Sequence, residues 1–411
     1  MPSPSQVLTD LAARRRVAER SFSTPGRVLG AEIEWLTFAE DEDFHRPSLD
    51  TMRSSFSAAL PETSLVTFEP GGQLEISTQP GSLTQTLSRA AHDVVEARER
   101  LQAIGVRTVG LGLDPVRPDE RVLFAPRYDA MEAYFDQRGP AGRRMMNGTA
   151  AIQINVNAGE PVDLNWQVAH AIGPVLSAAF ANSPLVRGAP TGWRSTRLST
   201  WWAIDRTRTA PVPTRSGAMD DWIDYVFAAN VMLIRVSPDD FRPVLGSLPF
   251  GRWVSDGHEL GYPTEDDLDY HLTTLFPPVR ARGWLELRFV DALPQPFWRV
   301  PIAVVGALFD KEESSARAVA ACEAVRGRWI EAARYGLAHP ELGAAAVECF
   351  AAASEALSAT DVDAVTKDAV AAFIDRYVSQ SRCPADDVLA AWTRGRSVLE
   401  EDAGLQAIGA V

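Results

Sequence analysis

The chain has 411 residues, of which 46% are hydrophobic and 23% are charged, a balance that excludes an intrinsically disordered protein. It has 40 basic and 54 acidic residues, a net charge of −14 and no basic block, which argues against nucleic acid as a partner. Only Lys311 and Lys367 are lysines, and neither fits a P-loop, a protein kinase or a Schiff-base enzyme, so arginine and metal must handle any phosphate.

The compartment is indicated by what the sequence lacks. Its longest apolar stretches, such as 300–309, have about ten residues, whereas spanning a bilayer takes roughly 20. The first 25 residues carry no secretory pattern, and Cys322, Cys349 and Cys383 match neither a disulfide framework nor a metal motif. We expect a cytoplasmic enzyme with no membrane or nucleic-acid contact and no obligatory protein partner.

Hydrophobic periodicity and turn signals predict a mixed order of helices and strands. In chain order these are a helix over 5–20, a strand over 28–38, a helix over 47–59, strands over 64–68 and 73–77, a helix from the capping box at Ser82 and Gln85 to 105, a strand over 106–111, a helix over 127–137, a strand over 149–157, helices over 163–181, 217–235 and 264–275, and a strand over 284–290. From about 295 onward the chain is predicted to be all helix. The lack of a regular βαβ rhythm favours an α+β fold on an antiparallel sheet.

The domain organisation follows from the same reading. We expect residues 1–411 to form a single catalytic domain, in which 1–310 is a mixed sheet and helix core that carries the site. Residues 311–411 are expected to be a helical C-terminal region that serves as scaffold.

Several predicted strands carry polar side chains on one face. Over 149–157, Thr149, Gln153, Asn155 and Asn157 share a face because side chains alternate along a strand, while the even positions are all apolar. A row of this kind is a candidate lining of a binding cavity.

Polar pairs at spacing i, i+2 extend the pattern. Two glutamates about 6.6 Å apart on a strand repel by roughly 2 to 3 kcal/mol at an effective dielectric near 20, so a shared cavity would need a cation or an arginine to offset the repulsion. Carboxylate oxygens without partnering Cys or paired His favour Mg²⁺, or Mn²⁺, over Zn²⁺. The pairs are Glu32 with Glu34, Gln73 with Glu75, and Glu286 with Arg288, and Glu69 lies beside them at a Pro-Gly-Gly turn.

At these same residues the sequence resembles the glutamate-cysteine ligase family, of the plant and bacterial type. The specific motifs are the Glu-Pro-Gly-Gly-Gln-x-Glu block over 69–75 and the His-Leu-Thr-Thr block over 271–274, with Gly-Ala-Glu-Ile-Glu over 30–34 and Leu-Glu-Leu-Arg over 285–288. The matching stretches run in family order from about 28 to 310. The resemblance implies a glutamine-synthetase-like antiparallel sheet that forms a funnel-shaped active site covered by helices. It is strongest to actinobacterial members that serve ergothioneine biosynthesis.

The reaction that the resemblance implies is ATP-dependent. ATP phosphorylates the γ-carboxylate of L-glutamate, and the amino group of L-cysteine attacks the γ-glutamyl phosphate to give γ-glutamylcysteine, ADP and phosphate. A transferring phosphoryl group accumulates negative charge, which metal ions and arginine stabilise.

The resemblance also implies a set of roles. The residues expected to bind Mg²⁺ or Mn²⁺ are Glu32, Glu34, Glu69, Glu75, Gln153 and Glu286. Arg288, Glu75 and Glu286 are the expected catalytic residues, and Gln73, Asn155, Arg280 and Arg288 are expected to bind ATP. The amino-acid substrates are expected at Arg127, Met146, Thr149 and Arg197, with Tyr225 and Trp298 beside the cysteine side chain. His271 is expected to be structural, because it is a lone histidine late on a predicted helix.

Three alternatives remain open from the sequence. The acceptor could be another amine, the enzyme could be a guanidino-type phosphotransferase, or the chain could be a non-catalytic protein that retains the fold. Loss of the metal carboxylates would indicate the last alternative, and here all five glutamates are present.

Overall fold

The computed structural model describes residues 7–23, 28–41 and 44–399. Within these ranges one seven-stranded sheet has the order β10-β11-β5-β1-β3-β2, and β4 pairs with the second half of β1. All pairings in it are antiparallel. Its strands are β1 (Leu29–Ala39), β2 (Leu65–Phe68), β3 (Leu74–Ser77), β4 (Val106–Val109), β5 (Ala151–Asn157), β10 (Val279–Ala281) and β11 (Trp284–Asp291). The small hairpins are β6 (Leu185–Val186) with β7 (Ala189–Pro190), and β8 (Leu233–Ser237) with β9 (Asp240–Pro243).

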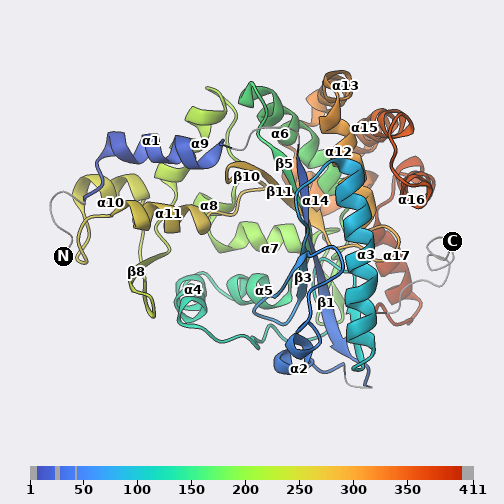
Figure 1. The fold of residues 1–411 in the computed structure, drawn as a ribbon, viewed down its shortest axis with the longest axis horizontal. Helices are drawn as coiled ribbons and strands as arrows, with labels where there is room; N and C mark the ends of the chain where they lie inside the picture. The colour runs from blue at the N-terminus through green and yellow to red at the C-terminus, as the bar shows by residue number, and fades with distance from the viewer. Residues whose placement is uncertain (1–6, 24–27, 42–43, 400–411) are drawn as a thin grey trace.

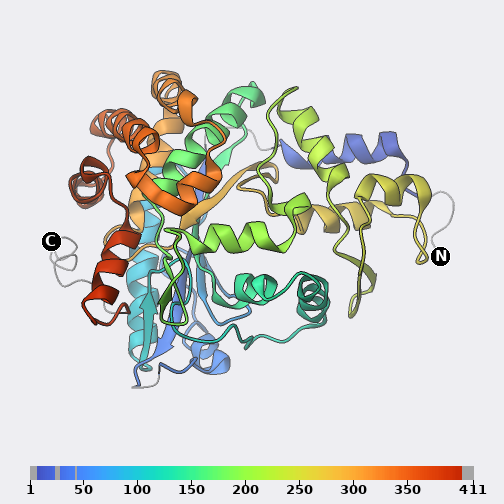
Figure 2. The ribbon, with the colours of Figure 1, turned by 180° about the vertical axis from the view of Figure 1, so that it is seen from behind.

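Helices pack on both faces of the main sheet (Figure 1). The helices before the last strand are α1 (Asp10–Ser21), α2 (Leu49–Ser54), α3 (Leu83–Gln102), α4 (Pro126–Asp136), α5 (Ala141–Gly148), α6 (Val162–Ala179), α7 (Thr196–Ile204), α8 (Arg206–Thr209), α9 (Ala218–Ala228), α10 (Phe250–Asp256) and α11 (Glu265–Thr273). After it come α12 (Arg299–Asp310), α13 (Glu312–Cys322), α14 (Trp329–Tyr335), α15 (Pro340–Ser358), α16 (Ala364–Arg376) and α17 (Pro384–Thr393). Figure 2 shows this C-terminal group stacked together on one side of the molecule.

The two faces of β1 have different environments. Ala31, Ile33 and Trp35 are at most 2% exposed and belong to the main hydrophobic core. The ring of Trp35 meets the edge of Trp298, which is the N-cap residue of α12, at 6.4 Å. The core therefore lies between the sheet and the helices behind it, and the even-numbered residues of β1 project from the opposite face.

The α+β architecture predicted from the sequence is confirmed, and several elements end differently. The helix predicted over 5–20 begins at Asp10, and residues 1–6 lie outside the described ranges. The helix predicted over 47–59 is only α2, and the helix predicted over 217–235 ends at Ala228. The apolar run that follows Ala228 forms the first strand of the β8–β9 hairpin instead. Strand β10 and helices α5, α7 and α10 were not predicted.

Within the described parts of the chain, no helix combines the length and the apolar character that crossing a membrane requires.

Candidate active site

Strand register gathers the polar rows of the sequence on one face of the sheet. In an antiparallel pair, directly opposite residues project to the same side. Glu34 lies opposite Glu75, and Glu32 lies opposite Gln153. Farther along the sheet, Glu286 lies opposite both Asn155 on β5 and Arg280 on β10. The alternation predicted from the sequence is therefore the alternation that the strands adopt.

A cavity of about 530 Å³ opens over this face. Its floor comes from the sheet, and its walls come from the helices α4, α5, α7 and α11. The residues that line it are Glu32, Glu34, Glu69, Pro70, Gln73, Glu75, Ser77, Arg127, Tyr128, Met131, Met145, Met146, Thr149, Gln153, Arg197, Trp201, Tyr270, Thr273, Phe276, Arg280, Arg282 and Arg288.

Glu69 reaches the cavity from a tight turn between β2 and β3. The backbone N–H of Gly72 donates to the carbonyl of Glu69 at 2.8 Å, and Gly72 has φ +88°, a conformation that favours glycine. A Cβ atom at Gly71 would lie 1.9 Å from the backbone oxygen of Asn147. The Pro-Gly-Gly sequence thus lets the turn pass directly against α5 and brings Glu69 beside the carboxylates of β1 and β3.

Neutral donors hold Glu32, Glu34 and Glu75 in place. Glu34 accepts from the backbone N–H of Ala151 at 2.8 Å and from Nε2 of Gln153 at 2.6 Å. Glu75 accepts from the hydroxyl of Thr67 at 2.8 Å, and Glu32 accepts from Nδ2 of Asn155 at 3.0 Å. The glutamates are oriented before any ligand binds.

Glu286 has a different environment from the other glutamates. It has no exposed surface, and its carboxylate lies 2.6 Å from Arg280 and 2.9 Å from both Arg282 and Arg288. Burial opposes its ionisation, but these guanidinium groups outweigh burial and hold the pKa of Glu286 well below its usual range. Glu286 therefore stays charged and fixes three arginines along one edge of the cavity.

Burial and mutual repulsion raise the pKa values of Glu32, Glu34 and Glu69. Desolvation, followed by the charges of Glu69 and Glu75, raises the pKa of Glu34 to about 8. Desolvation is also the largest cause for Glu32 and Glu69, whose pKa values rise to about 7. Near neutral pH the cavity therefore retains protons that a cation could displace.

Unpaired polar atoms face this region. Buried polar groups in proteins almost always have a partner, so an orphan beside a cavity indicates a ligand. The buried atoms without a partner among the lining residues include Nε of Arg127, Nε of Arg197, Nε1 of Trp201, the hydroxyl of Tyr270 and Oε1 of Gln73. Donors outnumber acceptors in this set, so it suits an anionic ligand.

The carboxylate oxygens of this cavity are ligands that suit a hard divalent cation. Four carboxylates line one cavity, and carboxylate oxygens are the ligands that Mg²⁺ takes. In the described ranges, no three acidic, histidine or cysteine side chains already converge on a common metal position. The glutamates are instead turned toward their hydrogen-bond donors, so binding a cation would require their side chains to rotate.

Most of the residues expected from the resemblance line this cavity, and four do not. Glu286 and Asn155 lie on the same sheet face and contact lining residues: Glu286 pairs with Arg280 at 2.6 Å, and Nδ2 of Asn155 donates to Glu32 at 3.0 Å. Trp298 is fully buried in the core, and Tyr225 stacks on Trp222 at 5.6 Å with its hydroxyl unpartnered. Neither aromatic residue contributes to this cavity.

Sequence reasoning gave no site role to several lining residues. Arg282 follows β10 in the turn to β11, and only its contact with Glu286 at 2.9 Å shows its place at the site. Tyr270 and Thr273 both come from α11 at spacing i, i+3, which places them on one side of a helix. Trp201 lies in the part of the chain that resembles the family, but no role was assigned to it, and α7 was not predicted. His271 is structural, as expected: it is buried and stacks on Phe250 at 4.7 Å.

Comparisons with known proteins show which family the chain resembles. The model of a family described as glutamate-cysteine ligase family 2 matches residues 28–404. Glutamate-cysteine ligase EgtA of Mycolicibacterium smegmatis is 40% identical over 377 residues, or 88% of this chain and 86% of that one. Glutamate-cysteine ligase EgtA of Mycobacterium tuberculosis is 39% identical over 404 residues, or 94% of this chain and 91% of that one. A solved bifunctional glutathione synthetase from Pasteurella multocida has a TM-score of 0.54 at 14% identity over 97% of this chain and 54% of its own, a likeness of fold alone.

Proposed function

Since the chain belongs to glutamate-cysteine ligase family 2 and is a glutamate-cysteine ligase, we propose that it forms γ-glutamylcysteine in two chemical steps at the expense of ATP. In the first step an oxygen of the glutamate γ-carboxylate attacks the terminal phosphorus of ATP and ADP leaves. In the second the amine of cysteine attacks the acyl carbon, the C–N bond forms, the C–O bond to phosphate breaks, and the amine releases a proton.

One observation carries this proposal. A single cavity places four glutamates opposite a group of arginines, on a sheet face that the hydrophobic core does not use. Phosphoryl transfer from ATP to a carboxylate brings two anionic reactants together, so positive charge must hold them. The glutamates are suited to metal, and the arginines to the anions themselves.

The arginines are fixed before substrate arrives. Arg288 is held by Glu286 at 2.9 Å and by Oε1 of Gln153, while Arg280 is held by Glu286 and by the carbonyl of Leu275 at 2.9 Å. Planar guanidinium groups bind phosphate or carboxylate oxygens through paired N–H donors. We propose that Arg280 and Arg288 bind the phosphates of ATP, and that Glu286 acts by positioning both.

Glutamate is proposed to bind beside these arginines, at Arg197 and Arg127. Arg197 is 2% exposed, and its Nη2 donates to the carbonyl of Arg288 at 2.8 Å. Its unpartnered Nε, with that of Arg127, is available for a carboxylate of the substrate. Thr149 and Met146, which line the same cavity, complete this proposed site.

A bound Mg²⁺ would neutralise phosphate charge and polarise the phosphorus. We propose Glu32, Glu34, Glu69 and Glu75 as the residues that would hold it, with Gln153 orienting Glu34. The product is proposed to feed ergothioneine or other low-molecular-weight thiol synthesis, as the sequence resemblance implies, and the reaction is placed in the cytoplasm, where ATP is supplied.

The test is a phosphate-release assay with ATP, Mg²⁺ and glutamate. Phosphate should be released strongly only when cysteine is added, with a product of γ-glutamylcysteine mass. Equal turnover with unrelated amines would refute cysteine as the acceptor. Glu75→Gln should abolish turnover, whereas Glu99→Gln, at an exposed position on α3, should not change it. Wild-type rates in Glu75→Gln would refute the metal assignment.

A further inference from the structure

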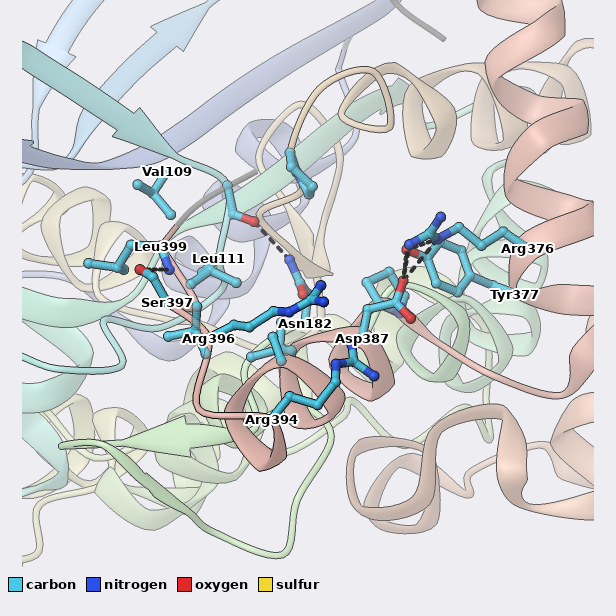
Figure 3. Close-up of a pocket in the computed structure, with 16 residues that line it drawn as sticks. Val109, Leu111, Asn182, Arg376, Tyr377, Asp387, Arg394, Arg396, Ser397 and Leu399 are labelled. Atoms are coloured by element: carbon cyan, nitrogen blue, oxygen red, sulfur yellow. Dashed lines mark hydrogen bonds and ion pairs between the residues drawn. The ribbon is translucent and has the colours of Figure 1, made fainter. Parts of the chain in front are cut away.

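A second cavity of about 590 Å³ lies between the sheet and the last helices (Figure 3). It shares no lining residue with the active-site cavity. One wall comes from the end of β4 and the segment after it, and another from α17 and the chain that follows α17. The residues that line it are Val109, Gly110, Leu111, Asn182, Pro294, Arg376, Tyr377, Pro384, Asp387, Val388, Ala391, Arg394, Arg396, Ser397, Val398 and Leu399.

The end of α17 presents two arginines to this cavity. Gly395 has φ +65°, the backbone N–H of Arg396 donates to the carbonyl of Ala391 at 3.0 Å, and that of Gly395 donates to the carbonyl of Trp392 at 3.0 Å. These two bonds form a Schellman motif, which fixes the chain reversal at the helix end. Figure 3 shows the side chains of Arg394 and Arg396 extending toward the same space, between Asn182 and Asp387.

The positive charge at this cavity is not neutralised by its own acidic residue. The carboxylate of Asp387 is already bound by Arg376 at 2.9 Å, by Arg382 at 2.6 Å and by the hydroxyl of Tyr377 at 2.8 Å. Among the described residues, the guanidinium groups of Arg394 and Arg396 have no acceptor within hydrogen-bonding distance. Two cations are thus directed to one place in a protein whose net charge is −14.

Part of the remaining wall is apolar. Val109 and Leu111 come from the sheet side, and Val388, Val398 and Leu399 come from the C-terminal side. A cavity with an apolar wall and a few convergent polar groups is the usual form of a small-molecule site. Arg394 and Arg396 are exposed, but unlike arginines on a plain surface they have this apolar wall beside them.

We propose that this cavity is a second binding site, for a small organic anion. Its carboxylate or phosphate group binds Arg394 and Arg396, and its apolar body packs against Val109, Leu111 and Leu399. Charge-assisted bonds from two guanidinium groups fix the anionic end, and desolvation of the apolar wall adds affinity without requiring one particular shape.

The test uses 8-anilinonaphthalene-1-sulfonate, an aromatic anion whose fluorescence rises in an apolar environment, titrated into the full chain. One molecule should bind, and saturating ATP with glutamate should not displace it. Arg394→Ala with Arg396→Ala should weaken binding about tenfold or more. The matched control, Arg53→Ala with Arg215→Ala, removes the same charge from two exposed positions and should leave binding unchanged.

The proposal would be overturned by equal binding of the Arg394 and Arg396 double variant or by displacement by the active-site substrates. It would also be overturned by binding that begins only after Glu400, Glu401 and Asp402 are changed to amides. The last result would identify the acidic sequence that follows Leu399 as the occupant. If the double alanine variant does not fold, ionic strength gives a second measurement. Raising it from about 0.05 to about 0.5 M should weaken wild-type binding several-fold, and salt-independent binding would refute the arginine contacts.

Discussion

Replacing Glu34 with glutamine should make the ligand-free protein more stable at neutral pH, although it removes a proposed metal ligand. Burial, with repulsion from Glu69 and Glu75, raises the pKa of Glu34 to about 8 from a usual value of 4.5. The folded protein therefore keeps a proton at Glu34 that the unfolded chain releases. Glutamine resembles the protonated form and has no proton to lose.

The magnitude follows from the gap between the two pKa values. Below pH 4.5 Glu34 is protonated in both the folded and the unfolded state, so it does not lower the free energy of unfolding. As the pH rises from 4.5 toward about 8, the unfolded chain ionises first and the free energy of unfolding falls, by about 3 kcal/mol at pH 7. The Glu34→Gln variant lacks this loss, so it should match the wild type near pH 4 and exceed it by about 3 kcal/mol at pH 7.

Urea unfolding followed by tryptophan fluorescence, with EDTA present and at pH values from about 4 to 8, measures the effect. Glu99→Gln removes the same charge at an exposed position and should change stability by less than about 0.5 kcal/mol at every pH. The reasoning fails if Glu34→Gln is no more stable than wild type at pH 7, or if both proteins show the same pH dependence. Turnover of Glu34→Gln should be lost even though the fold is strengthened.

Four further predictions address other parts of the site. The Mg²⁺ affinity of the wild type should rise between about pH 6 and pH 8, because Glu34 must release its proton when the cation binds. Calorimetry in buffers of different ionisation enthalpy should detect that released proton. An Mg²⁺ affinity that does not change with pH would contradict the prediction. Glu286→Gln should cost about 3–5 kcal/mol of stability and lower turnover at least a hundredfold, whereas Asp205→Asn, which breaks a buried pair with an arginine away from the cavity, should lose stability but keep turnover. Gly71→Ala should abolish turnover or folding, because its Cβ would overlap a backbone oxygen, while Gly246→Ala, with open space around it, should be neutral in both unfolding and activity assays. Tyr225→Phe should leave the KM for cysteine unchanged, since its hydroxyl is unpartnered and lies off the cavity; a raised KM would place Tyr225 at the substrate.

The sheet face of the site could be predicted because strand alternation is a local property. Glu32 and Glu34 on β1 share a face whatever the rest of the chain does, and so do Glu286 and Arg288 on β11. Which strands are neighbours is not local. The sequence could pair charges within a strand, but only the register shows that Glu34 lies opposite Glu75.

The walls of the cavity were less predictable, because they depend on tertiary packing. The apolar run after Ala228 has no strong turn signal until Pro238, so periodicity extended helix α9 too far. Tyr225 and Trp298 are aromatic residues within the stretch that resembles the family, yet both pack in the core. Residue type alone does not distinguish an aromatic side chain in the core from one that lines the cavity. Paired carboxylates on a strand have few structural uses, so they are a stronger indication of a site.

Alternation along β1 also determines which mutations the family can tolerate there. A substitution at Glu32 or Glu34 changes chemistry and leaves the packing of Ile33 and Trp35 intact, so such positions can diverge while the fold persists. An insertion or deletion of one residue would exchange the two faces, placing carboxylates in the core and Ile33 in the cavity. Evolution of this strand should therefore proceed by replacement and never by a change in length.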